Sequence, residues 1–87
     1  MVGVSKSLLK IWIRKFLRRL GRKDRDFTFN LINKLPITPK EKIIMELRYI
    51  EGLTWDEIAN HKGVYLSKAR VVQIEKECIE TLEFLIF

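Results

Sequence analysis

Apolar side chains recur every three or four residues along most of the chain, which is the spacing of one face of an α-helix. The clearest run lies between Ser5 and Leu20, where basic residues fill the intervening positions. Its apolar members are Leu8, Leu9, Ile11, Trp12, Ile13, Phe16, Leu17 and Leu20. Ser5 or Ser7 can cap the start, and Gly21 suits a left-handed stop. The pattern predicts an amphipathic helix with a wide apolar face.

The next helices are delimited by residues that favour helix starts and stops. A charged linker, residues 22–26, leads to a second helix that begins near Asp24 or Asp26 and ends before Pro36. This helix buries some combination of Phe27, Leu31, Ile32 and Leu35. Two Thr-x-x-Glu boxes then mark helix starts, because both side chains satisfy free N–H groups of the first turn. The boxes are Thr38 to Glu41, with Pro39 in the first turn, and Thr54 to Glu57.

Two more signals complete the pattern. Gly52 ends the third helix, and Ser67 caps a fifth helix that follows the short fourth one. The fifth helix turns one apolar side inward, made of Val71, Ile74, Cys78, Leu82 and Leu85. No segment alternates apolar and polar residues for long enough to predict a strand. The fold class is therefore all-α, a small bundle of about five helices with a basic amphipathic N-terminal helix.

Charge divides the chain at residue 26. Residues 1–26 hold nine Lys and Arg against two Asp, a net charge of +7, whereas residues 27–87 hold eight against nine acidic residues, a net charge of −1. We therefore expect a basic helix and linker over 1–26 and a domain over 27–87. A basic arm predicts a polyanionic partner, either nucleic acid or an anionic membrane surface. The cations that would contact phosphates are Lys10, Arg14, Lys15, Arg18, Arg19, Arg22 and Lys23.

Nucleic acid is the favoured partner of the arm, because so small a domain needs the arm's apolar face for its core. Trp12 and Phe16 on that face leave a membrane-surface helix as the alternative. No apolar run is long enough to span a bilayer, and the regions of a signal peptide are absent. We expect a soluble, cytoplasmic protein.

Catalysis has little basis in the sequence. His61 is the single histidine, there is no Cys/His cluster for a metal and no glycine-rich phosphate loop. Cys78 is the single cysteine, which excludes an intrachain disulfide and suits a small core residue. We expect no enzyme activity, no metal, no cofactor and no small-molecule substrate.

The fourth and fifth helices, joined by a turn that contains Gly63, have the spacing of a helix-turn-helix. With Val71 and Ile74 turned inward, the first turns of the fifth helix present a different set of side chains to a major groove. The predicted DNA-binding residues are Thr54, Ser67, Lys68, Ala69, Arg70, Val72 and Gln73. A helical hairpin with good caps is the alternative to DNA binding.

Each predicted contact follows from side-chain chemistry. Gln73 has the donor and acceptor pair that reads adenine, and Lys68 can reach guanine or a phosphate. Ala69 or Val72 can pack on a thymine methyl, and Arg70 is better aimed at a phosphate. The free N–H groups near Thr54 and Ser67 could add anion contacts.

The rest of the fifth helix is acidic, with Glu75, Glu77, Glu80 and Glu83. Only its first turns can therefore approach DNA. We favour a solvated acidic face over one that meets a basic partner.

Several motifs together resemble region 4 of bacterial sigma factors. They are Leu35-Pro36, Lys40 to Ile44, Leu47-Arg48-Tyr49, Glu51 to Ala59, Arg70-Val71 and Gln73-Ile74-Glu75. The resemblance covers about residues 30–83, and it implies a recognition helix that binds an upstream promoter element and a domain that holds the β flap of RNA polymerase. Lys68, Arg70 and Gln73 match the family's groove residues. No segment resembles the sigma region that melts the other promoter element and grips the polymerase clamp. The resemblance therefore implies a freestanding region 4, such as a small bacterial or phage regulator or one half of a split factor.

The sequence departs from the family in two places. Tyr65 and Leu66 lengthen the turn by two residues. Ala69 and Val72 stand where the family commonly has glutamate and arginine, which weakens the expectation of the family's own promoter sequence.

Two functions follow from these observations. The leading one is a transcription regulator that binds double-stranded DNA, and the alternative is a module that binds RNA polymerase or a sigma factor without reading bases. The alternative draws on the apolar groove face of Ala69 and Val72. It also draws on the apolar carboxyl end, which is Leu82, Phe84, Leu85, Ile86 and Phe87. Such an end completes the core, docks on a partner or forms a homodimer, and we favour core completion.

Overall fold

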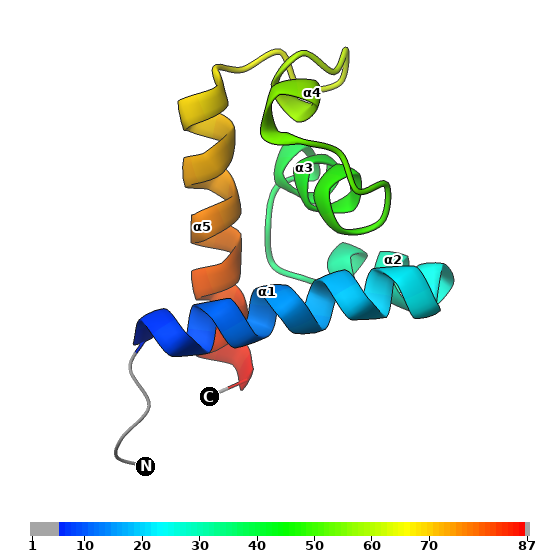
Figure 1. Cartoon of the computed structure of the whole chain (residues 1–87), viewed down its shortest axis with the longest axis vertical. Coiled ribbons are helices and arrows are strands. Elements are labelled where there is room, and N and C mark those ends of the chain that lie inside the picture. Colours follow the sequence, from blue (N-terminus) through cyan, green and yellow to red (C-terminus); the bar gives the residue numbers. More distant parts are fainter. Residues whose placement is uncertain (1–5, 87) are drawn as a thin grey trace.

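The computed structural model of the chain describes residues 6–86, with side chains from Leu8 to Ile86. Within these residues it contains five α-helices and no strand, which confirms the all-α class. They are α1 (Lys6–Lys23), α2 (Arg25–Asn33), α3 (Pro39–Tyr49), α4 (Trp55–Ala59) and α5 (Lys68–Ile86). In Figure 1, α1 crosses α5 near the carboxyl end of α5, and the other helices lie in the angle between them. The predicted cap of α1, Ser5 or Ser7, lies outside the described side chains.

Hydrogen bonds at the caps confirm the predicted helix starts. Thr38 and Thr54 each accept from the backbone N–H of the glutamate three residues on, at 3.2 Å, and that glutamate accepts from the threonine N–H at 2.7 and 2.9 Å. The Ser67 hydroxyl accepts from the Arg70 N–H at 3.1 Å. The second helix begins directly after Asp24, which caps it. Each cap stabilises its helix by about 1 kcal/mol, so local sequence fixes where these helices begin.

One core receives side chains from every helix. Its buried apolar residues are Ile13 and Leu17 of α1, Ile32 and Leu35 of α2 and its exit, Ile44, Met45, Leu47 and Tyr49 of α3, Ile58 and Ala59 of α4, Val64, and Val71, Ile74, Cys78, Ile79 and Leu82 of α5. The helix-turn-helix thus rests on α1 as well as on α3. The boundary at residue 26 stays a prediction, although α1 shares its core with the rest of the chain.

Gly21 differs from its predicted role. It does not stop the first helix, which continues to Lys23, so the predicted linker over 22–26 is reduced to Asp24 between two helices. Gly21 is buried against the end of α3, where an added Cβ would lie 1.9 Å from the carbonyl oxygen of Tyr49. Glycine is therefore needed for close approach of two backbones and not for a left-handed conformation.

Other apolar positions predicted to face inward lie at the surface. Leu85 is more than half exposed, as are Trp12 and Leu8 on α1. Of the candidates for burial in the second helix, Ile32 and Leu35 are buried, whereas Phe27 is exposed. The core covers one side of α1, through Ile13 and its neighbours one turn away, and leaves the rest of the wide apolar face outside. The carboxyl end of α5 runs on past the place where α1 crosses this helix (Figure 1).

Candidate nucleic-acid interface

The longer turn between α4 and α5 is held by backbone hydrogen bonds and one buried side chain. The Tyr65 N–H donates to the carbonyl of His61 at 3.1 Å, and the Leu66 N–H donates back to α4 at 3.3 Å. Val64 is buried, whereas Tyr65 is 71% exposed. The left-handed residue of this turn is Tyr65, with φ of 45°, rather than Gly63. Of the two extra residues, Tyr65 thus lies at the surface, whereas Leu66 is partly buried and packs against the core in which Val64 is anchored.

The first turns of α5 present the predicted groove face to solvent. Val71 and Ile74 are buried beneath it. The side chains at the surface are Lys68, Ala69, Arg70, Val72 and Gln73. Their exposure agrees with the predicted orientation, because residues three and four apart share one side of a helix. These side chains are accessible to a nucleic acid.

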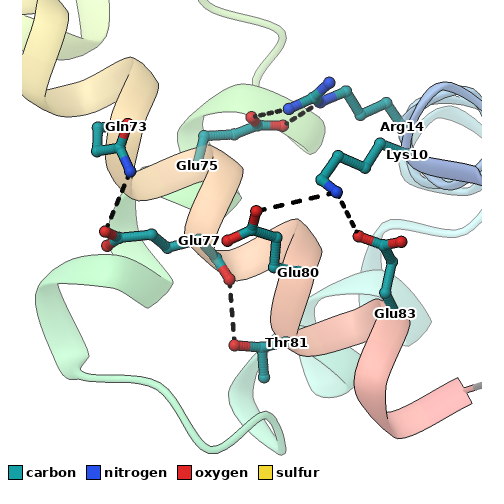
Figure 2. A network of polar contacts seen from close by, with 8 residues as sticks. All are labelled: Lys10, Arg14, Gln73, Glu75, Glu77, Glu80, Thr81 and Glu83. Carbon is teal, nitrogen blue, oxygen red and sulfur yellow. Dashed lines mark hydrogen bonds and ion pairs between the residues drawn. The ribbon is translucent and has the colours of Figure 1, made fainter. Parts of the chain in front are cut away.

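Three of the exposed side chains have acidic partners within the chain. Lys68 Nζ lies 3.7 Å from a carboxylate oxygen of Asp56, and Arg70 lies 4.0 Å from Glu77. The Gln73 amide donates to Glu77 at 3.2 Å, as Figure 2 shows. Because these contacts are exposed to water, each contributes little, and a phosphate or a base edge can replace it.

Thr54 and Ser67, at the helix starts, form capping hydrogen bonds within the chain. The Thr54 hydroxyl and N–H are both bonded to Glu57, whose carboxylate lies at the start of α4. The Ser67 hydroxyl accepts from Arg70. An anion approaching α4 at this point would therefore meet a carboxylate before it met free N–H groups.

Glu75 follows the first two turns of α5 and carries a buried carboxylate, since the residue is only 1% exposed. It accepts hydrogen bonds from Arg14 Nε and Nη2, each at 3.0 Å, and from the Tyr49 hydroxyl. Figure 2 shows Arg14 reaching it from α1. The hydrogen bonds to Glu75 raise the pKa of Arg14, and burial followed by the Glu75 charge raises the pKa of Tyr49. Sequence reasoning missed this network, whose members come from three helices.

The acidic side of α5 faces α1 over part of its length. The prediction that these glutamates are solvated is therefore wrong for Glu75 and Glu83. Lys10 of α1 lies 2.8 Å from Glu83 and 3.9 Å from Glu80 (Figure 2). Only 12% of the Glu83 side chain is exposed. The basic partner of this face is therefore the chain's own first helix.

This pairing divides the basic arm into two groups. Lys10 and Arg14 are held in ion pairs with α5. The other arm cations are exposed and have no ion-pair partner within residues 6–86. They are Lys15, Arg18, Arg19, Arg22 and Lys23. The second group is the part of the arm that is open to phosphates.

Arg48 connects α3 to α4, a role that the sequence pattern does not indicate. Its guanidinium carbon lies 3.9 Å from the centre of the Trp55 ring, a cation–π contact, and Nη1 donates to the Leu53 carbonyl at 2.9 Å. Gly52, with φ of +72°, reverses the chain between the two helices. Arg48 therefore fixes the entry into the helix-turn-helix.

Few other groups in the described residues offer chemistry. Burial raises the pKa of the Cys78 thiol to about 12, so the thiol stays protonated and inert near neutral pH. No set of three His, Cys, Asp or Glu among residues 6–86 is placed to hold a metal ion. Among the described helices, none has both the length and the apolar character that crossing a bilayer requires.

Comparison with known proteins identifies the helix-turn-helix. The family model for sigma-70, region 4, matches residues 33–83, more than half of the chain. No curated protein and no solved structure gives a match. The matched residues include α3, α4 and most of α5, whereas α1 precedes them. Members of this family are DNA-binding helix-turn-helix domains and not enzymes. The chain therefore belongs to the sigma-70 region 4 family.

Proposed function

We propose that this protein is a transcription regulator that reads a promoter element in duplex DNA with the first two turns of α5. The observation that carries the proposal is the exposed row that includes Lys68, Val72 and Gln73, above buried Val71 and Ile74, in a member of a DNA-binding family. Gln73 would bond adenine, and Val72 would contact a thymine methyl. Lys68 would contact guanine or a phosphate.

Phosphate contacts would supply most of the affinity. Arg70 at the groove edge and the exposed cations of α1 carry the positive charge, whereas Lys10 and Arg14 are neutralised inside the chain. Releasing the counterions of several phosphates makes such binding fall steeply with salt. The sequence preference would come from the side chains of α5 that reach base edges.

Fluorescence anisotropy tests this proposal with two duplexes, one random and one carrying the upstream promoter element of the family. We expect selective binding with a salt slope of several phosphates. Gln73→Ala should reduce selectivity by about 1–3 kcal/mol, and Arg70→Ala should weaken both duplexes alike. Lys76→Ala removes an equal charge further along α5 and serves as the control. Equal affinity of all four proteins for both duplexes would refute the groove assignment.

A second function, docking on RNA polymerase or a sigma factor, is favoured by the carboxyl end of α5. Phe84 is 84% exposed, and Leu85 and Ile86 are more than half exposed. Core completion, the favoured interpretation of these residues from sequence, is therefore wrong for 84–86, although Leu82 is buried. Phe87, which belongs to the same prediction, lies outside the described residues. Large exposed apolar groups mark interaction sites. They lie at the opposite end of α5 from the recognition turns, so DNA and a protein could be held together (Figure 1).

Replacing Phe84 and Leu85 by serine tests the docking function. Helix content should be unchanged, because both side chains are at the surface, and capture of purified RNA polymerase should be abolished. Leu82→Ser is the contrasting variant, since this buried residue should lower stability instead. Undiminished capture by the double variant would exclude this end of α5 as the docking site.

A further inference from the structure

A cavity of about 310 Å³ opens between α1 and the end of α3. It is lined by Arg18, Arg22, Arg48, Tyr49, Ile50 and Gly52. Half of these residues are arginines, and none carries a carboxylate. The cavity lies beside the entry to the helix-turn-helix, because Arg48 stacks on Trp55 at the start of α4.

The backbone contact at Gly21 brings these arginines together. It allows α1 to touch the Tyr49 carbonyl, next to Arg48 in the sequence. Arg18 and Arg22 are four residues apart and so lie on the same side of α1, with Gly21 between them. The cluster is therefore a consequence of how closely α1 and α3 pack.

The positive charge of the cluster is not balanced within the described residues. Arg18 and Arg22 form no ion pair there, and the adjacent Glu51 is paired with Arg25 at 2.8 Å. Arg48 Nε is buried and has no acceptor among residues 6–86. Burial first, and then the charge of Arg18, lowers the pKa of Arg48, whose guanidinium also stacks on Trp55 and donates to the Leu53 carbonyl. An anion in the cavity would relieve the repulsion between these guanidinium groups.

We propose that this cavity binds a phosphate group through the guanidinium groups of Arg18, Arg22 and Arg48. Planar guanidinium forks match the oxygens of a phosphate, which they bind with paired, charge-assisted hydrogen bonds. The phosphate comes either from the DNA backbone or from a free phosphate compound. Binding of a DNA phosphate here rests on the proposed function, whereas binding of a free phosphate compound does not. Two of the three arginines precede the residues matched by the family model.

Titration of the full chain with inorganic phosphate at constant ionic strength tests the site directly. The backbone amide signals of Ile50 and Gly52 should move and saturate in an NMR titration. Arg18→Gln/Arg22→Gln should weaken phosphate binding by about tenfold or more, because two charged donors are removed. The control is Arg19→Gln/Lys23→Gln, which removes the same charge from the same helix at positions that do not line this cavity. It should bind phosphate nearly as the wild type does.

Binding of duplex DNA across a range of salt concentrations then identifies the source of the phosphate. If DNA supplies it, Arg18→Gln/Arg22→Gln should lower the salt slope by roughly one for each phosphate that the variant no longer neutralises, and by more than the control. If the slope is unchanged while inorganic phosphate binding is abolished, the site serves a free phosphate compound. If wild-type protein binds inorganic phosphate but no DNA, the proposed function fails and the phosphate site stands.

Two results would overturn the proposal. One is wild-type protein that shows no saturable change with inorganic phosphate. The other is equal weakening in both double variants, which would show that net charge, or the neighbouring cavity lined by Lys15, Arg18, Arg19, Arg22 and Lys23, attracts the anion instead. All four substituted side chains are exposed, so both variants should keep the helix content of the wild type.

Discussion

Removing the Arg14 side chain should destabilise the fold far more than removing any exposed arginine of α1. Arg14→Met deletes both guanidinium donors to Glu75, each 3.0 Å from its acceptor, and leaves a carboxylate that is 1% exposed with the Tyr49 hydroxyl as its remaining donor among these contacts. Breaking a buried ion pair costs about 3–5 kcal/mol. Because 34% of the Arg14 side chain reaches solvent, we expect the lower end, about 3 kcal/mol.

That loss is a large part of the stability of a domain of this size, which is about 5–15 kcal/mol. Urea unfolding followed by circular dichroism should therefore show a clear fall in the midpoint for Arg14→Met. Arg19→Met removes an exposed cation from the same helix and should change stability by no more than about 0.5 kcal/mol. This variant controls for helix propensity and net charge.

A double-mutant cycle separates the ion pair from other effects. Glu75→Gln removes the buried charge, so Arg14→Met should cost much less in that background than in the wild type. We expect a coupling energy between the two positions of at least about 1 kcal/mol. If Arg14→Met costs no more than Arg19→Met, or if the two changes are additive, the reasoning about a buried uncompensated carboxylate is refuted.

Three shorter predictions concern packing, capping and reactivity. Gly21→Ala should lower the unfolding free energy by about 1–3 kcal/mol, because its Cβ would meet the Tyr49 carbonyl oxygen at 1.9 Å, and a gain in urea midpoint would contradict this contact. Thr54→Ala should cost about 1 kcal/mol in the same assay through loss of the Glu57 capping box, and no change would show that α4 is held by packing alone. The Cys78 thiol, with its pKa raised to about 12, should react slowly with a thiol reagent at pH 8 and rapidly in urea, and fast labelling of folded protein would disprove its burial.

Local sequence was sufficient to predict where helices begin. At Thr38, Thr54 and Ser67 the capping side chain and the N–H it satisfies are three residues apart, so no tertiary information is needed. The same local periodicity predicted which side of the first two turns of α5 faces outward. The sequence pattern also predicted the all-α class correctly.

Contacts between distant residues could not be predicted in the same way. Glycine at position 21 is typical of a helix stop, and only the position of Tyr49 shows that it permits close packing. Arg14 and Glu75 are 61 residues apart, and the pattern of each helix alone indicates a solvated charge. The exposed end of α5 was missed for a related reason, because periodicity identifies an apolar face but not how far the core extends along it.

The first helix combines two roles that its composition alone does not separate. In its first half, Lys10 and Arg14 are paired with acidic residues of α5, and this fixes the helix that carries the predicted DNA-binding residues. In its second half, Arg18 and Arg22 face a cavity without carboxylates. Because the first group is neutralised inside the chain and the second is not, substitutions in the two groups should have different effects. Loss of Arg14 should lower stability, whereas loss of Arg18 should leave stability intact and weaken phosphate binding.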